Sequence, residues 1–391
     1  MDKKINKEAY TFSDVLIVPK YSEIESRRSV DLSSDFGFFK INLPIIAANM
    51  KTICGVKMSI AMIENGGMGI LHRFCSIEQA VEDFLEVKNH FSVNEGLISN
   101  TISLGNSTVI LKDEDKYSES CSSFNSSTFN IHPNIKSICN KDHEIGVSIG
   151  VQDEDKKRFD SLYEAGAKIF CIDIAHGHSL VMKNILKWIK EKGLKDIYII
   201  AGNVSTPEGA YDIAEWGADC IKCGVGPGSA CLTRKNTGVG VPQLYALESI
   251  NEEFIRQGIK HIKIIADGGM SSIGDIAKSL KYSHAVMLGS MLSGSTETPG
   301  NVFTGERGEF YKVYAGSASG ENKVSNGNAN EFVEGVAKMA PFRGHVKHIL
   351  KHIKHGLQSS FSYVGAKNLK EFQEKCEFIE ITSGGKIESK L

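Results

Sequence analysis

Eight short apolar segments alternate along the chain with longer amphipathic segments. The intervening stretches DEDKKRFDSLYEAG (153–166) and TPEGAYDIAEWG (206–217) place apolar residues at helical spacing and end on a glycine, a common helix stop. Apolar segments that are continuous rather than alternating predict parallel strands buried on both faces. These segments are residues 43–50, 68–73, 145–151, 167–177, 197–203, 219–226, 262–269 and 285–290.

Strand and helix units repeated in this way predict a (β/α)8 barrel, in which helices cover a ring of parallel strands. A doubly wound sheet is the alternative fold for the same pattern. It would carry a Gly-x-Gly-x-x-Gly turn after its first strand, whereas the sequence there reads AANMKT (47–52). We therefore expect an α/β fold of the barrel type.

Two polar segments interrupt the pattern. Residues 93–142 are rich in Ser, Asn, Asp and Lys without sustained periodicity, which predicts a largely flexible insertion after the second strand. Residues 316–332 are also poor in apolar residues and follow the eighth strand, where a mobile flap would cover the barrel mouth. Residues 1–92 and 143–391 are expected to form a single catalytic barrel.

The composition excludes several classes of protein. A formal net charge of −2 does not suit a nucleic-acid binder driven by positive charge, and no apolar run is long enough to span a membrane. The start MDKKINKEAY lacks the apolar core of a signal peptide, which predicts a cytoplasmic protein whose nine cysteines are free thiols. A peroxisome or glycosome is the alternative, because residues 389–391 read Ser-Lys-Leu.

Barrel enzymes place their catalytic groups at the carboxyl ends of the strands. In this sequence the strand ends carry polar side chains and glycines, which suit a polar, phosphorylated ligand. The turns ADGGM and LGSM, after the seventh and eighth strands, fall where barrels commonly bind phosphate. The side chains at the strand ends are Asn49, Met50, His72, Arg73, Asp173, His176, His178, Asn203, Lys222 and Asp267.

Two patterns could indicate metal sites. Cys220 and Cys223 have Cys-x-x-Cys spacing, but on a predicted strand their side chains point to opposite faces, so ordinary buried thiols are expected. The stretch HVKHILKHIKH (345–355) has histidines at helical spacing. Its interleaved lysines, with no carboxylate or cysteine among them, favour a solvated helix face.

The glycine-rich segment GVGPGSACLTRKNTGVG (224–240) contains Cys231, a thiol for which a phosphate-binding loop has no use. Together with TFSDVLIVP, IDIAHGHS, AGNVST, IADGG and VMLGSML, it resembles the IMP dehydrogenase/GMP reductase family. The resemblance covers nearly the whole chain except residues 93–142. It implies a (β/α)8 barrel, usually a homotetramer, in which the cysteine attacks C2 of a purine nucleotide.

The family contains two reactions that share this covalent intermediate. One oxidises IMP with NAD⁺ and then hydrolyses the intermediate with water activated by an Arg-Tyr pair on the flap. The other expels ammonia from GMP and delivers hydride from NADPH, giving IMP. The predicted flap has no arginine, because Arg343 is the next one after Arg307, and lysine differs from arginine in geometry and basicity. We therefore expect the reductive reaction.

Other positions agree with this choice. Asn49 and Ile174 stand where members of the oxidative branch commonly carry other residues. Residues 93–142 are too short and polar for the paired regulatory module that many of those members insert, but this does not separate the branches, because some oxidative members lack the module and compact reductive members have no insertion there. Two alternatives remain open. One is an oxidative enzyme with an altered flap, and the other is a non-catalytic nucleotide-binding protein of the same fold.

The resemblance also implies roles for individual residues. Cys231 would be the nucleophile and Thr233 would relay a proton to the leaving ammonia. Glu334 would hold the edge of the base and help to protonate the leaving group. The substrate-binding residues that it implies, with Asp267 on the ribose hydroxyls, are Met50, Ser229, Asp267, Gly268, Gly269, Gly289, Ser290, Gly316, Ser317 and Gly335.

For the cofactor, Asp173 matches the family residue near the nicotinamide. Ser26 and Arg27 match positions that reach the adenosine end from a neighbouring subunit, where an arginine would suit the 2′-phosphate of NADPH. Backbone carbonyls of Gly226, Gly228 and Cys231 match a monovalent-cation site, with K⁺ expected. The cofactor-binding residues implied are Ser26, Arg27, His72, Asp173, Ile174, Ala175, Asn203 and Gly224.

Overall fold

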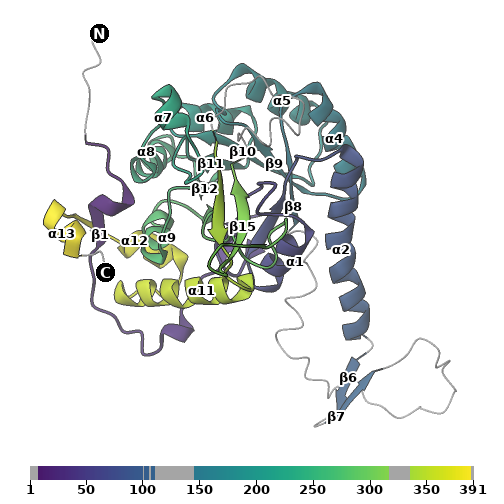
Figure 1. Ribbon diagram of the computed structural model, residues 1–391. Helices are drawn as coiled ribbons and strands as arrows, with labels where there is room; N and C mark the ends of the chain where they lie inside the picture. The colour runs from purple at the N-terminus through teal and green to yellow at the C-terminus, as the bar shows by residue number, and fades with distance from the viewer. Residues whose placement is uncertain (1–7, 100, 105–106, 111–144, 317–334, 389–391) are drawn as a thin grey trace, which may run out of the picture.

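The computed structural model describes residues 8–99, 101–104, 107–110, 145–316 and 335–388 (Figure 1). Its centre is a closed barrel of parallel strands in the order β10-β11-β12-β13-β4-β5-β8-β9. Each strand overlaps one of the apolar segments, so the predicted (β/α)8 barrel is confirmed. The strands are β4 (Ile45–Ala47), β5 (Met68–Leu71), β8 (Ile145–Ile149), β9 (Ile169–Asp173), β10 (Tyr198–Val204), β11 (Cys220–Cys223), β12 (Lys263–Asp267) and β13 (Ala285–Leu288).

Helices connect the strands and cover the outside of the barrel (Figure 1). In α6 (Pro207–Trp216), Thr206 caps the first turn by accepting a hydrogen bond from the Gly209 N–H at 3.2 Å, and Gly217 ends the helix in a left-handed conformation. The other helices around the barrel are α1 (Val56–Glu64), α2 (Ile77–Ser99), α4 (Asp153–Glu164), α5 (Leu180–Glu191), α8 (Gln243–Arg256), α9 (Ile273–Leu280) and α11 (Val346–Tyr363).

A short hairpin covers the end of the barrel at which the strands begin. β2 (Ser34–Asp35) pairs antiparallel with β3 (Lys40–Ile41), and Phe36 and Phe39 between them stack with ring centroids 4.7 Å apart. Phe39 meets the ring of Tyr198, the first residue of β10, edge-on at 5.3 Å. Ligands would therefore enter at the opposite end, where the strands terminate.

Regular structure continues into the predicted insertion. α2 extends to Ser99, so the predicted boundary at residue 93 falls inside a helix. A hairpin of β6 (Thr101–Leu104) and β7 (Ser107–Ile110) follows, beyond the end of α2 (Figure 1). The rest of the insertion lies outside the described residues, and its flexibility stays a prediction.

A three-stranded antiparallel sheet follows the barrel strands and was not predicted. It consists of β14 (Phe303–Thr304), β15 (Phe310–Ala315) and β16 (Ala337–Pro341). β15 and β16 flank the predicted flap, of which only Gly316 is described. The sheet therefore places both ends of the flap segment side by side.

The two ends of the described chain also pair with each other. β1 (Val15–Ile17) is antiparallel to β17 (Phe378–Glu380), and Lys20 Nζ lies 2.5 Å from Glu377 Oε1 next to this pair. The short helices η1 (Phe12–Asp14), η2 (Arg27–Ser29), α12 (Leu369–Lys375) and α13 (Ser383–Glu388) complete these segments.

Two surface predictions concern targeting and the histidine stripe. In the part of the chain that the structure describes, no helix is long and apolar enough to cross a membrane. The Ser-Lys-Leu sequence at residues 389–391 lies outside the described residues, so the compartment stays a prediction. His348, His352 and His355 are exposed along α11, which confirms the expected solvated helix face.

His284 makes the stability of the fold depend on pH. Its Nδ1 accepts a hydrogen bond from the Ile264 N–H at 3.1 Å, and burial lowers the pKa of its imidazole from 6.5 to about 4. The unfolded chain therefore binds more protons between those values, so stability is complete above pH 6.5 and is lost as the pH falls towards 4. Burial lowers the pKa of His72 to about 4 as well, which adds to the loss.

We expect His284→Gln to reduce this acid sensitivity. The free energy of unfolding should fall between pH 7 and pH 5 by about 1–2 kcal/mol less in the variant than in the parent. Urea unfolding at the two pH values measures the difference, with His348→Gln on the exposed face of α11 as the control. An unchanged pH slope in His284→Gln would show that His284 is not kept neutral by the fold.

Candidate active site

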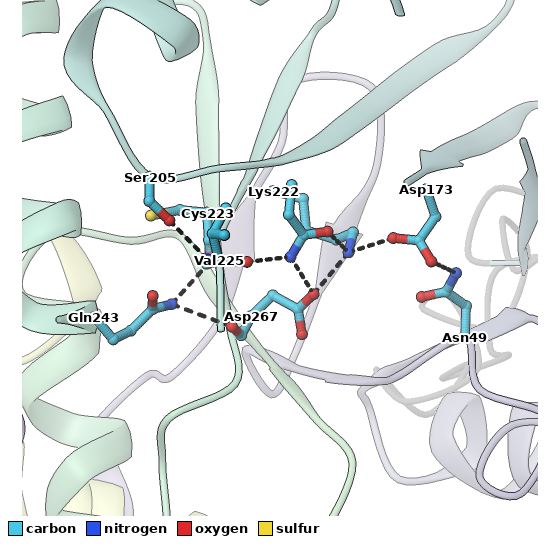
Figure 2. A network of polar contacts seen from close by, with 10 residues as sticks. Asn49, Asp173, Ser205, Lys222, Cys223, Val225, Gln243 and Asp267 are labelled. Carbon is cyan, nitrogen blue, oxygen red and sulfur yellow. Dashed lines mark hydrogen bonds and ion pairs between the residues drawn. The ribbon is translucent and has the colours of Figure 1, made fainter. Parts of the chain in front are cut away.

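The interior of the barrel mouth holds a buried lysine between two carboxylates (Figure 2). Lys222 of β11 is 2% exposed, and its Nζ lies 2.7 Å from Asp173 Oδ1 of β9 and 2.7 Å from Asp267 Oδ2 of β12. Burial alone would lower the pKa of Lys222, but the two carboxylates outweigh burial and raise it. The lysine is therefore a fixed positive charge at neutral pH.

Two asparagines extend this network across the barrel. Asn49 Nδ2 donates to Asp173 Oδ2 at 2.9 Å, and Asn203 Nδ2 donates to Asp267 Oδ2 at 2.8 Å and to the Gly224 carbonyl at 2.7 Å. Burial would raise the pKa of Asp173, but Lys222 and the Asn49 hydrogen bond hold it below its usual value. Predicted substrate and cofactor residues thus belong to one network, which Figure 2 shows.

Gln243, the first residue of α8, ties the ends of β11 and β12 together. Its Nε2 donates to the Cys223 carbonyl at 2.8 Å and to the Asp267 carbonyl at 3.3 Å. Gly224 follows Cys223 with a φ of 145°, and a Cβ there would lie 2.2 Å from the Asp267 carbonyl oxygen. The close approach of these two strand ends therefore requires glycine.

Cys231 lies on the loop after β11, with its Sγ 3.1 Å from Thr233 Oγ1. A thiol and a hydroxyl at this distance can pass a proton between them, and the hydroxyl can donate to a thiolate. Among the described cysteines, only Cys231 and Cys75 are partly exposed. Burial raises the pKa of Cys75. Of the described cysteines, Cys231 alone combines partial exposure with a hydroxyl partner, so its role as nucleophile stays the prediction that this geometry favours.

The segment that follows the predicted flap holds the cysteine loop. Gly335 forms an antiparallel bridge with Cys231, and the Val336 N–H donates to the Ala230 carbonyl at 3.0 Å. Lys338 Nζ donates to the Ser229 carbonyl at 2.6 Å. The predicted residues Ser317 and Glu334 lie outside the described residues, so their roles stay predictions.

Arg234 fastens the far end of the same loop. Added Cβ atoms at Gly226 and Gly240 would each lie 2.6 Å from Arg234 Cγ, so its side chain runs between these two glycines. Its guanidinium also donates to the Val241 carbonyl. The stem of a single side chain thus sets the spacing between the two ends of the loop, a role that its position in the sequence does not reveal.

The first of the two predicted phosphate-binding turns, at Gly268 and Gly269, lies against the cysteine loop. A Cβ at Gly268 would lie 3.2 Å from the Gly228 nitrogen, and one at Gly269 would lie 3.2 Å from Pro227 Cβ. Both glycines have positive φ, of 79° and 86°. Ser290, in the other turn, accepts hydrogen bonds at its carbonyl from Ser293.

Tyr314 of β15 lies beside Gly289, in the second of the two predicted phosphate-binding turns. A Cβ at Gly289 would lie 3.1 Å from Tyr314 Oη and 3.2 Å from Met50 Sδ, so these residues surround one point. Burial raises the pKa of Tyr314, and its phenol therefore stays protonated at neutral pH. Sequence reasoning missed Tyr314, Gln243 and Lys338, because none follows a barrel strand; the only available signal was the position of Tyr314 beside the flap.

The predicted cofactor residues fall into two groups. Asp173, Asn203 and Gly224 belong to the lysine network, and Ile174 next to them exchanges backbone hydrogen bonds with Gly202 and Asn203 at 3.1 and 2.9 Å. Ala175 follows Ile174. His72, at the end of β5, accepts a hydrogen bond from the Phe74 N–H at 3.2 Å and is neutral at pH 7 because burial lowers its pKa to about 4.

Ser26 and Arg27 form the second group, and the structure does not place them next to Cys231 of the same chain. Ser26 precedes η2, and the Arg27 guanidinium lies over the ring of Tyr363 in α11, 5.2 Å from its centroid. Tyr363 is exposed, as is Arg27. These residues therefore lie on an outer surface of the protomer, as a residue that reaches a neighbouring subunit would.

Comparisons with known proteins agree with the geometry. The family sequence model described as "IMP dehydrogenase / GMP reductase domain" matches residues 9–391. An inosine-5′-monophosphate dehydrogenase from Nitrosopumilus maritimus is 34% identical over 98% of this chain and 98% of its own length. A GMP reductase from Leishmania donovani is 30% identical over 98% of this chain and 96% of its own length.

A solved structure matches over nearly the whole chain. It is a cysteine-to-alanine variant of GMP reductase from Trypanosoma brucei in complex with guanosine 5′-monophosphate. It superposes with a TM-score of 0.81 and 30% sequence identity, over 99% of this chain and 98% of that chain. The chain therefore belongs to the IMP dehydrogenase/GMP reductase family.

Proposed function

We propose that this enzyme is a GMP reductase that uses NADPH. The Cys231 thiolate adds to C2 of GMP, the exocyclic amine leaves as ammonia after protonation, and a covalent thioimidate remains. Hydride from NADPH then adds to C2 and the thiolate leaves, giving IMP. In sum, GMP, NADPH and two protons give IMP, NADP⁺ and ammonium.

The observation that carries the proposal is the contact between Cys231 and Thr233 at the barrel mouth, with 3.1 Å between Sγ and Oγ1. Thr233 can take the thiol proton and pass it to the departing amine, which is a poor leaving group until it is protonated. Glu334, next to the Gly335 bridge partner of Cys231 in the sequence, would hold the base edge and supply protons with Thr233.

The reductive direction is supported by the residues of the flap. No arginine occurs between Arg307 and Arg343, so this segment offers no guanidinium to activate a hydrolytic water. The reductive reaction needs no such water. Curated relatives include both GMP reductases and inosine-5′-monophosphate dehydrogenases, so the direction is the point that an experiment must decide.

For the ligands, the proposal places the ribose of GMP on Asp267 and its phosphate on the glycine turns around Gly268 and Gly289. The nicotinamide would lie near Asp173, and Arg27 of a neighbouring protomer in a homotetramer would bind the 2′-phosphate of NADPH. The carbonyls of Gly226, Gly228 and Cys231 are neutral oxygen donors, which fit K⁺. A bound ion there would keep the cysteine loop in one conformation.

Two assays of the purified protein test the direction by following the absorbance of the reduced nicotinamide. With GMP and NADPH, we expect the absorbance to fall while ammonia is released. With IMP, NAD⁺ and K⁺, we expect no rise. A rise in the second assay alone would contradict the proposal and show that this chain is an IMP dehydrogenase. Activity in neither assay, with nucleotide still bound, would favour a binding protein.

A further inference from the structure

The ammonium of Lys222 uses all of its hydrogen-bond donors within the site. Its acceptors are Asp173 Oδ1, Asp267 Oδ2 and the side-chain carbonyl of Asn203. A lysine has three N–H groups and no acceptor, so this one has none left for a ligand. Lys222 therefore acts on ligands only through the residues that it holds.

The two carboxylates that Lys222 joins differ in what they leave available. Both oxygens of Asp173 are occupied, Oδ1 by Lys222 and Oδ2 by Asn49. In Asp267, Oδ2 accepts from both Lys222 and Asn203, whereas Oδ1 accepts from no residue that the structure describes (Figure 2). Oδ1 of Asp267 is therefore the one carboxylate oxygen of the pair that accepts no hydrogen bond from the described residues and has both acceptor positions open to a ligand.

We propose that Lys222 is a positioning residue that sets the preference of the site for ribonucleotides over 2′-deoxyribonucleotides. Lys222 and Asn203 fix the Oδ2 edge of Asp267, and this fixes the direction of Oδ1. A carboxylate oxygen can accept two hydrogen bonds, which matches the 2′- and 3′-hydroxyls of one ribose. The assignment of the ribose to Asp267 rests on the proposed function.

The backbone alone does not fix Asp267 in this way. Asp267 is the last residue of β12 and its side chain is partly exposed, so without Lys222 its carboxylate can turn about its side-chain bonds. Losing Lys222 would also leave Asp173 and Asp267 without the cation between them, and two carboxylates that share a buried site tend to share a proton. Both changes weaken the hold of Asp267 on the 2′-hydroxyl.

Isothermal titration of GMP and 2′-deoxy-GMP into the full chain, without cofactor, tests the proposal. The parent should bind GMP more tightly by about tenfold or more, the discrimination expected for a hydrogen bond to a charged group. In Lys222→Met and in Asp267→Asn the ratio of the two Kd values should fall towards one. Lys278→Met is the control: it removes a buried lysine of α9 that donates to the Phe12 carbonyl. In this variant the ratio should stay that of the parent.

A second variant guards against misfolding of Lys222→Met. Lys222→Met combined with Asp173→Asn removes one of the two carboxylates, so that the buried site keeps a single negative charge; thermal unfolding checks that it folds. It should lose the preference for GMP as well. An unchanged ratio of the two Kd values in either folded lysine variant would overturn the proposal, even if both nucleotides lose affinity by the same factor. Neither result alters the turnover assays that decide the direction of the reaction.

Discussion

Cys231→Ala is expected to abolish turnover of GMP and NADPH while GMP binding persists. In the proposed reaction the thiolate forms the covalent bond to C2, and Thr233 next to it cannot replace it because a hydroxyl is a far weaker nucleophile at neutral pH. The loss should be on the order of 10⁴-fold or more. Stopped reactions over hours measure the residual rate, and titration with GMP measures binding.

Cys75→Ala is the control, because Cys75 is the other partly exposed cysteine that the structure describes. It should keep a rate within about twofold of the parent, as expected for a side chain outside the chemistry. If Cys231→Ala retained more than about 1% of the parent rate, covalent catalysis by this residue would be refuted.

Gly224→Ala should have the largest effect on the framework of the site. A Cβ at Gly224 would lie 2.2 Å from the Asp267 carbonyl oxygen, which is backbone and cannot turn away. The ends of β11 and β12 must therefore separate by about 1 Å, at a cost of about 3 kcal/mol or more in unfolding free energy. Lys222 and Asp267 move with these ends, so the rate should also fall by about 100-fold.

Gly258→Ala is the matched control for this variant. Gly258 also has a positive φ, of 70°, but an added Cβ there meets nothing within 4 Å. Gly258→Ala should lower the free energy of unfolding by only about 1 kcal/mol, because the left-handed backbone alone opposes a side chain there, and it should leave the rate unchanged. Urea unfolding and initial rates measure both variants. Equal stability losses in the two would mean that the approach of β11 to β12 tolerates a side chain.

The barrel could be predicted because its strands are buried on both faces. β8, for example, is buried at every position, which appears in the sequence as a continuous apolar run. The sheet of β14, β15 and β16 could not, since both residues of β14 and most of β16 are exposed. The pairing of β1 with β17 depends on contacts between opposite ends of the chain, which local patterns do not encode.

Much of the site could be predicted because topology alone gathers strand ends. Asn49, Asp173, Asn203 and Asp267 lie at the carboxyl ends of four different strands and meet in one network. The sequence could not show that Lys222 would occupy its centre, since a lysine at a strand end usually reaches solvent. The roles of Gln243 and Arg234 depend on which carbonyls and glycines lie beside them in the folded chain.

The pairing of β1 with β17 also bears on how the protein is made. Ribosomes release the amino-terminal end first, so Val15–Ile17 emerges long before its partner Phe378–Glu380 exists. β4 is likewise synthesised well before β13, the strand with which it closes the barrel. Each nascent chain therefore carries two open strand edges, which neighbouring chains on the same messenger could join. Chaperones that cover these edges would be needed until β13 and β17 have emerged and paired.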